Sequence, residues 1–183
     1  MLKQQEDSQN LWLSRWIARR AEGEVIRDSM LAVSGQLDPS MYGPGTLNEN
    51  MKRRSIYFFI KRSKLIPSMM LFDWPEHLVS IGKRSQTTIA PQALSFLNSS
   101  QGRECARGLA DRLTKKTIKG VVDEVFWLAL SRAPRTEEQR LGETFMMQQE
   151  KVYAGQTPAG AFQNACVDLC QMVMSTNEFI YIE

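Results

Sequence analysis

The sequence contains one histidine, three cysteines and no long apolar run. With His77 as its only imidazole, the chain has little of the acid–base machinery that most enzymes build on histidine, so catalysis would need carboxylates or a bound cofactor. Cys166 and Cys170 lie one helical turn apart and Cys105 stands alone, a pattern that offers no disulfide framework, and we expect all three to be buried. No apolar segment reaches the roughly 18 residues of a membrane-spanning helix.

Familiar catalytic and cofactor motifs are also missing. The sequence has no nucleophile elbow, no His-Glu-x-x-His, no haem-attachment Cys-x-x-Cys-His and no glycine-rich dinucleotide loop. Asp73, Glu76 and His77 are close in sequence, but such trios in loops are usually helix caps and solvated charges. We therefore expect no metal site and no cofactor in this chain, and no residue can be named as catalytic.

A secretion signal is absent from the first thirty residues. The segment Met1–Asn10 is polar, and arginines interrupt the apolar positions that follow it. The sequence alone therefore predicts a disordered tail over residues 1–10 and a cytoplasmic location.

Apolar residues make up 43% of the chain, and most of them recur at helical spacing. The spacing predicts a first helix over Leu11–Leu37, with Trp12 and Trp16 on its apolar seam. Further helices are expected on either side of a break near 98–102. The last third predicts three more: one at Val121–Leu130, one opening with Thr136 as N-cap, and one at Phe162–Val173.

The aromatic segment Ser55–Ile60 predicts a short strand, with a buried helical turn as the close alternative. The fold class is therefore mainly α, an irregular multi-helix domain with at most one short strand pair. We expect residues 11–183 to form a single helical domain, with two lobes over 11–98 and 103–183 as the alternative.

Basic residues gather around the aromatic segment. Six of them and no acidic residue occur between Lys52 and Lys64. They either form a solvated rim or meet an anion. Tyr57, Phe58 and Phe59 interleave with them as a nucleic-acid stacking platform would require, so nucleic-acid binding is a third and least favoured functional hypothesis.

Several segments, read in order, resemble one known family. They are residues 21–28 (AEGEVIRD), 31–38 (LAVSGQLD), 53–57 (RRSIY), 61–63 (KRS), 69–73 (MMLFD), 83–94 (KRSQTTIAPQAL), 97–98 (LN), 128–134 (LALSRAP) and 177–181 (NEFIY). The chain is similar over about Asn10–Glu183 to domain-of-unknown-function family 1553, the C-terminal domain of large secreted planctomycete proteins.

This resemblance carries its own expectations. Full-length relatives are expected to be exported to the periplasm or cell surface and to hold haem c on an upstream cytochrome c-like domain. The chain resembles the C-terminal half of the family domain, so we expect it to be truncated on its N-terminal side. The function implied is a helical binding or interaction module beside a redox domain; the alternative is part of an extracellular enzyme acting on polysaccharide or another complex substrate.

Truncation would leave the seam of the first helix uncovered. We therefore expect an apolar patch around Trp12 and Trp16, either exposed or covered by the missing part of the domain or by another chain.

The candidate anion- or ligand-binding residues are the polar ones inside the family-like segments. Some flank the aromatic segment, and others open a helix whose N-terminus favours anions. If they converge they form a cationic pocket; the alternative is separate structural salt bridges. The set is Arg54, Lys61, Arg62, Arg84, Thr88 and Gln92.

Overall fold

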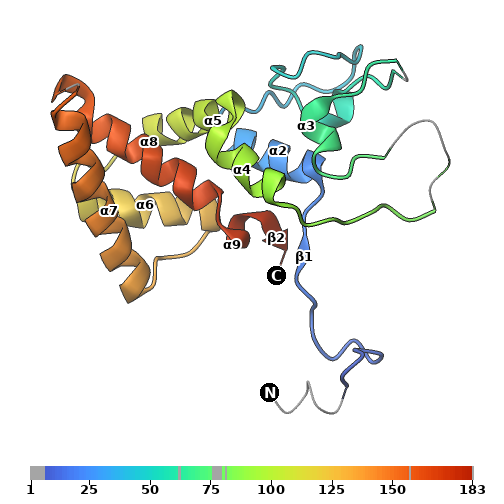
Figure 1. Ribbon diagram of the computed structural model, residues 1–183, viewed down its shortest axis with the longest axis horizontal. Coiled ribbons are helices and arrows are strands. Elements are labelled where there is room, and N and C mark those ends of the chain that lie inside the picture. The colour runs from blue at the N-terminus through green and yellow to red at the C-terminus, as the bar shows by residue number, and fades with distance from the viewer. Residues whose placement is uncertain (1–6, 62, 76–79, 81, 157, 183) are drawn as a thin grey trace.

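The computed structural model describes residues 7–61, 63–75, 80, 82–156 and 158–182. These residues contain eight α-helices and one two-stranded antiparallel sheet, so the prediction of a mainly α fold with one short strand pair is confirmed. Figure 1 shows α5 to α9 gathered on one side and α2 to α4 with long loops on the other. Among the described residues, no helix is long and apolar enough to cross a membrane.

The C-terminal helices pack around α8, which spans Ala161–Met174. It contacts α5 (Ser100–Asp111), α6 (Ile118–Leu130) and α7 (Thr136–Ala154). Its central residues are fully buried because apolar side chains recur at helical spacing. The three helices predicted for the last third of the chain are confirmed. The fully buried residues on α8 include Ala165, Leu169, Cys170 and Val173.

Helix α7 begins one residue earlier than its predicted cap implies. Arg135 is the N-cap residue and Thr136 is already helical. The Glu138 carboxylate accepts the backbone N–H of Arg135 at 2.7 Å and also binds the guanidinium of Arg132. Glu138 thus accepts the N–H of the cap residue itself, and the prediction of Thr136 as the N-cap is wrong.

The first helix is much shorter than predicted. Helix α2 spans Gly23–Val33, so the prediction of helix over residues 11–22 is wrong. The Asp7 carboxylate accepts the backbone N–H groups of Leu11, at 2.7 Å, and Trp12, at 3.2 Å, and so competes with helical hydrogen bonding. Residues 7–10, at the end of the predicted tail, thus form a turn, and residues 1–6 lie outside the described residues.

A short sheet then ties the N-terminal segment to the C-terminus. Strand β1 (Arg19–Arg20) pairs antiparallel with β2 (Tyr181–Ile182), which follows the short helix α9 (Asn177–Ile180). The chain enters α2 directly after β1. Gly23 opens α2 against Phe72, because a Cβ on Gly23 would lie only 2.7 Å from the Phe72 Cβ.

The aromatic segment forms a helical turn. Ser55–Tyr57 is a single 3₁₀ turn, η1, so the strand prediction is wrong. The alternative, a buried helical turn, is right only in part, because the turn ends at Tyr57 and Ile56, Phe59 and Ile60 are exposed. Asp28 of α2 fixes the turn, since its carboxylate accepts the Ser55 N–H at 2.8 Å and the Ser55 hydroxyl at 2.7 Å. Helix α3 (Pro67–Met70) follows. Helix α4 (Ala90–Asn98) is separated from α5 at Ser99, which confirms the predicted break.

One apolar core runs from α2 to α9, and a smaller cluster of Phe58, Ile66 and Met69 lies beside it. All three cysteines are buried, as predicted. Burial raises the pKa of the Cys166 thiol to about 11, so these thiols behave as small apolar side chains.

Candidate functional site

A cavity lies where α2, α3, α4 and α5 meet the loop of residues 49–52. Its volume is about 320 Å³ and it opens to solvent. Cavities of a few hundred cubic ångströms are the size that small-molecule sites use.

The cavity walls are mostly apolar and easily deformed. Met30 comes from α2, Met51 from the loop, and Met69 and Phe72 from the region of α3. Phe96 closes the far side, with its ring centroid 5.4 Å from that of Phe72. Methionine side chains are unbranched and polarizable, so three of them let the wall adapt to ligands of different outline.

Arg27 and Lys52 are the two cations in the cavity lining, and both already have partners. The Arg27 guanidinium donates to the carbonyl of Arg53 and the hydroxyl of Ser55, each at 3.1 Å, and lies 4.9 Å from the Phe58 ring centroid. Lys52 forms an ion pair with Glu104 at 2.6 Å.

Two other polar side chains in the lining, Glu49 and Ser68, make fewer hydrogen bonds than Arg27 and Lys52. The carboxylate of Glu49 accepts the backbone N–H of Ser68 at 3.4 Å, and its negative charge favours the charged form of the Arg27 guanidinium. The hydroxyl oxygen of Ser68 is buried without a hydrogen-bond partner in the described part of the chain.

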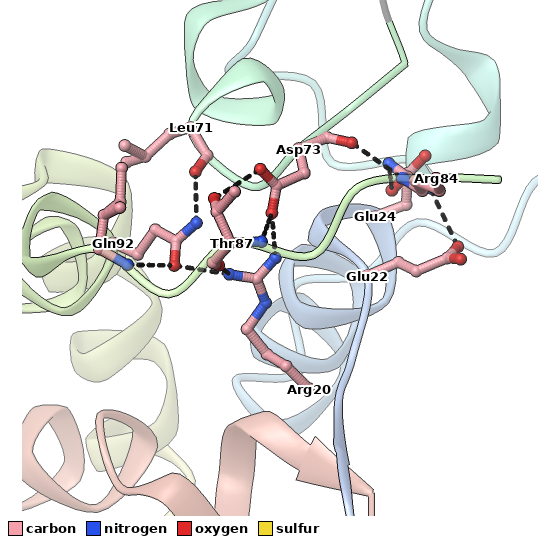
Figure 2. Close-up of polar contacts among 9 residues, drawn as sticks. Arg20, Glu22, Glu24, Leu71, Asp73, Arg84, Thr87 and Gln92 are labelled. Carbon is pink, nitrogen blue, oxygen red and sulfur yellow. Dashed lines mark hydrogen bonds and ion pairs between the residues drawn. The ribbon is translucent and has the colours of Figure 1, made fainter. Parts of the chain in front are cut away.

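A polar network holds the α3 side of the cavity in place (Figure 2). Asp73 accepts the Arg20 guanidinium at 2.6 Å, the Thr87 hydroxyl at 2.7 Å and the Thr87 N–H at 2.8 Å. Arg20 also donates to the side-chain oxygen of Gln92 at 2.5 Å. The network joins β1, the turn after α3 and the segment before α4, so it positions Phe72 at the cavity.

Asp73 is ionised in this network. Burial opposes its charge, but the hydrogen bonds from Thr87 and Arg20 and the charge of Arg20 outweigh burial and lower the pKa of Asp73. Its backbone lies in the left-handed region, with a φ of 60°. That conformation is strained for a non-glycine residue and persists because the network fixes both the side chain and the turn.

The structure brings two of the predicted site residues to this network. Arg84 donates to the Asp73 carbonyl at 3.0 Å and forms ion pairs with Glu22 at 3.1 Å and Glu24 at 2.8 Å. Gln92 is buried and donates to the Leu71 carbonyl at 2.9 Å. Neither residue lines the cavity, and both hold the loops around it through the contacts drawn in Figure 2.

The other predicted residues do not join them. Arg54 is largely exposed and lies 3.8 Å from Asp28. Lys61 and Thr88 are exposed, and Arg62 lies outside the described residues. In the same basic segment, Arg53 lies over the Tyr57 ring at 3.6 Å. Anion binding by this set stays a prediction. Within the described residues, no group of three or more His, Cys, Asp and Glu is placed to hold a metal ion, and Glu76 and His77 fall outside them.

A second exposed feature is the apolar N-terminal segment, defined here as Leu11–Ile17. Its large side chains are exposed, Trp12 by 79% and Trp16 by 62%. Arg15 bonds the carbonyls of the Asp7 turn, and the Trp16 indole N–H donates to the Ile182 carbonyl at 2.9 Å. The predicted apolar exposure is therefore present on a loop that extends away from the helices (Figure 1).

Sequence reasoning missed the cavity and the Arg20–Asp73 pair. The cavity residues come from four separate segments, and no short spacing links them. A usable signal was the methionine content, 10 of 183 residues, because methionines from distant segments often gather at adaptable binding surfaces.

Comparison with known proteins identifies one family. No curated protein and no solved structure matches the chain. A family model described as PSD1, protein of unknown function (DUF1553), matches residues 2–146. The match includes α2 to α6, the cavity and the Arg20–Asp73 network, and it ends within α7. Because it spans well over half of the sequence, the chain belongs to the DUF1553 family of proteins of unknown function.

Proposed function

We propose that this chain is a small-molecule-binding module whose ligand occupies the cavity between α2, α3, α4 and α5. The observation that supports this proposal is a solvent-accessible cavity of about 320 Å³, whose lining includes Met30, Met51, Met69, Phe72 and Phe96. Apolar cavities of about half that volume already bind benzene-sized molecules.

Binding of the neutral apolar dye Nile red, followed by its fluorescence, tests this proposal. Ser95 lines the cavity from α4, so the substitution Ser95→Phe places a ring in the space and should weaken binding at least about tenfold. Leu94→Phe is the matched control, because Leu94 lies on the same helix, is 51% exposed and does not line the cavity. Equal dye binding by both variants, with thermal unfolding like that of the wild type, would place the dye elsewhere and refute the proposal.

A second candidate function is docking onto a companion protein through the apolar N-terminal segment. It is favoured by the exposure of Trp12 and Trp16 on a loop fixed by its own hydrogen bonds. A loop that already has its bound conformation loses little conformational entropy on binding. The occupant we propose is the cytochrome c-like domain expected in exported, full-length planctomycete relatives, since a domain preceding this one in a polypeptide would emerge beside the segment.

Calorimetric titration with such a cytochrome domain from a relative tests the docking. The double substitution Trp12→Ser with Trp16→Ser should reduce affinity at least about tenfold, because aromatic anchors commonly dominate interfaces. Leu141→Ser provides the control, since Leu141 is 53% exposed on the distant helix α7. Unchanged affinity in the double variant would show that the segment is not the docking surface.

The remaining hypotheses have less support. For nucleic acid, the basic segment offers fewer free cations than its sequence indicates, because Lys52 and Arg54 lie against Glu104 and Asp28. For an enzyme acting on polysaccharide, the surface of the cavity is mostly apolar, whereas sugars need many polar partners.

A further inference from the structure

We propose that the loop before α3 docks this protein onto the surface of an anionic lipid bilayer, with its apolar side chains in the membrane interface and its lysines at the headgroup phosphates. The docking surface, which we name the basic–apolar tip, joins this loop to the η1 turn. It consists of Arg54, Ile56, Phe59, Ile60, Lys61, Lys64 and Leu65. The inference uses neither the cavity nor the N-terminal segment, so it is independent of both proposed functions.

The tip projects because the chain is anchored on both sides of it. Phe58 and Ile66 are buried and belong with Met69 to the smaller core cluster. The Phe58 ring also lies 4.9 Å from the Arg27 guanidinium. Between these two anchors, every described residue is exposed. Figure 1 shows the loops that precede α3, in cyan and teal, on the side of the molecule opposite α7.

The apolar side chains of the tip are exposed on a backbone that hydrogen bonds hold in place. Ile56 is 74% exposed and Ile60 is 56% exposed. The Phe59 N–H donates to the Thr46 carbonyl at 2.8 Å, and the Lys64 N–H donates to the Lys61 carbonyl at 3.1 Å, which closes the turn. Single exposed apolar side chains are common on proteins, whereas a cluster of them indicates a binding surface.

The charge of the tip is positive. No acidic residue occurs between residues 52 and 64. Arg54 lies 3.8 Å from Asp28, but its side chain is still 61% exposed. Lys61 and Lys64 are exposed, and neither forms an ion pair with a described residue. Anionic lipids attract lysines near the membrane surface, and the aliphatic stem of a lysine lies along the interface while its ammonium group stays in water.

A bilayer fits this composition better than nucleic acid or another protein does. Base stacking needs accessible aromatic faces, but Phe58 is buried and Arg53 lies over the Tyr57 ring at 3.6 Å. Protein interfaces are depleted of lysine at their centres. Aliphatic side chains beside lysines are instead typical of segments that lie in the membrane interface, where burial of apolar area and attraction to anionic lipids act together.

Cosedimentation of the full chain with phospholipid vesicles tests the docking. We expect binding to vesicles of phosphatidylcholine and phosphatidylglycerol in equal parts, and binding at least about tenfold weaker to phosphatidylcholine alone. Lys61→Gln with Lys64→Gln should weaken binding about 25-fold, since each lysine near an anionic surface contributes roughly fivefold. Ile56→Ser with Ile60→Ser should weaken it at least about tenfold, because these side chains supply buried apolar area.

Two matched controls separate the tip from general effects of charge and hydrophobicity. Lys116→Gln with Lys119→Gln removes the same charge from exposed positions that flank the start of α6. Trp12→Ser with Trp16→Ser removes the exposed apolar side chains of the N-terminal segment. Each control should change vesicle binding by less than about twofold. Losses in the controls as large as in the tip variants, or tip variants that bind like the wild type, would show that the tip is not the docking surface.

Insertion is measured with an environment-sensitive fluorophore on Ile60→Cys, because the three native cysteines are buried. Its emission should shift to the blue on addition of the anionic vesicles, and the same fluorophore on Leu141→Cys of α7 should not respond. An unshifted emission at position 60 in the bound state, or no vesicle binding by the wild type, overturns the proposal. Tighter binding to a single-stranded oligonucleotide than to the anionic vesicles would assign the tip to nucleic acid instead.

Discussion

Replacement of Arg20 by methionine should destabilise the fold strongly. The Arg20 and Asp73 side chains are only 9% and 13% exposed, and their contact distance is 2.6 Å. Arg20→Met keeps an unbranched chain of similar length but leaves the Asp73 carboxylate buried without its cation. Breaking one side of a buried pair costs roughly 3–5 kcal/mol. Asp73 retains two hydrogen bonds from Thr87, so we expect a loss near the lower end, about 3 kcal/mol in free energy of unfolding.

The pH dependence gives this prediction a second readout. The pKa of Asp73 is lowered in the folded chain, so the ionised carboxylate stabilises the wild type above the ordinary pKa of about 4. That contribution disappears as pH falls through the folded-state pKa. In Arg20→Met, burial without the cation raises the pKa of Asp73, and protonation then relieves the buried charge. The stability gap between wild type and variant should therefore be largest at pH 7 and should narrow toward pH 4.

Urea unfolding followed by circular dichroism measures both effects. Arg140→Met is the matched control, because Arg140 and Glu137 form an ion pair in which both side chains are more than 60% exposed, and its loss should be small. If Arg20→Met were no more destabilising than Arg140→Met, or if its deficit grew on acidification, the Arg20–Asp73 pair would not hold the fold as described.

Two further predictions concern backbone geometry. Gly23→Ala should lower the free energy of unfolding by roughly 1–3 kcal/mol, because the added Cβ would lie 2.7 Å from the Cβ of Phe72. Thermal unfolding measures this loss, and Gly155→Ala is the control because its added Cβ would lie 3.6 Å from the nearest atom. Ser131→Gly should stabilise the chain by about 0.5–1 kcal/mol, because Ser131 caps the C-terminus of α6 with a φ of 56°, a left-handed conformation that glycine adopts more readily. A decrease in melting temperature would contradict this cap conformation.

The spacing of apolar residues predicted the helices well where each helix is stabilised mainly by packing of its apolar face. The three helices of the last third follow their apolar stripes closely. The same spacing failed at Leu11–Arg20, because the side chains of Asp7 and Asn10 bond the backbone there and turn the chain before a helix can form. That competition depends on polar side chains outside the apolar pattern.

The candidate site was harder to predict from sequence. Arg84 and Gln92 were found because they lie in family-like segments, but their partners, Glu24 and the Leu71 carbonyl, come from other parts of the chain. The cavity is harder still, since its wall is assembled from four segments that only the tertiary fold brings together. Charge and motif searches do not register a space lined by methionine and phenylalanine.

The most direct test of ligand binding in the cavity is a methyl NMR titration of the chain labelled with ¹³C-methyl methionine. Addition of Nile red should shift the signals of Met30, Met51 and Met69, which line the cavity. The signals of Met146 and Met174, buried in the core outside the cavity lining, should stay in place. Shifts confined to exposed methionines such as Met41 and Met147, or spread evenly over all of them, would show that the cavity is not the binding site.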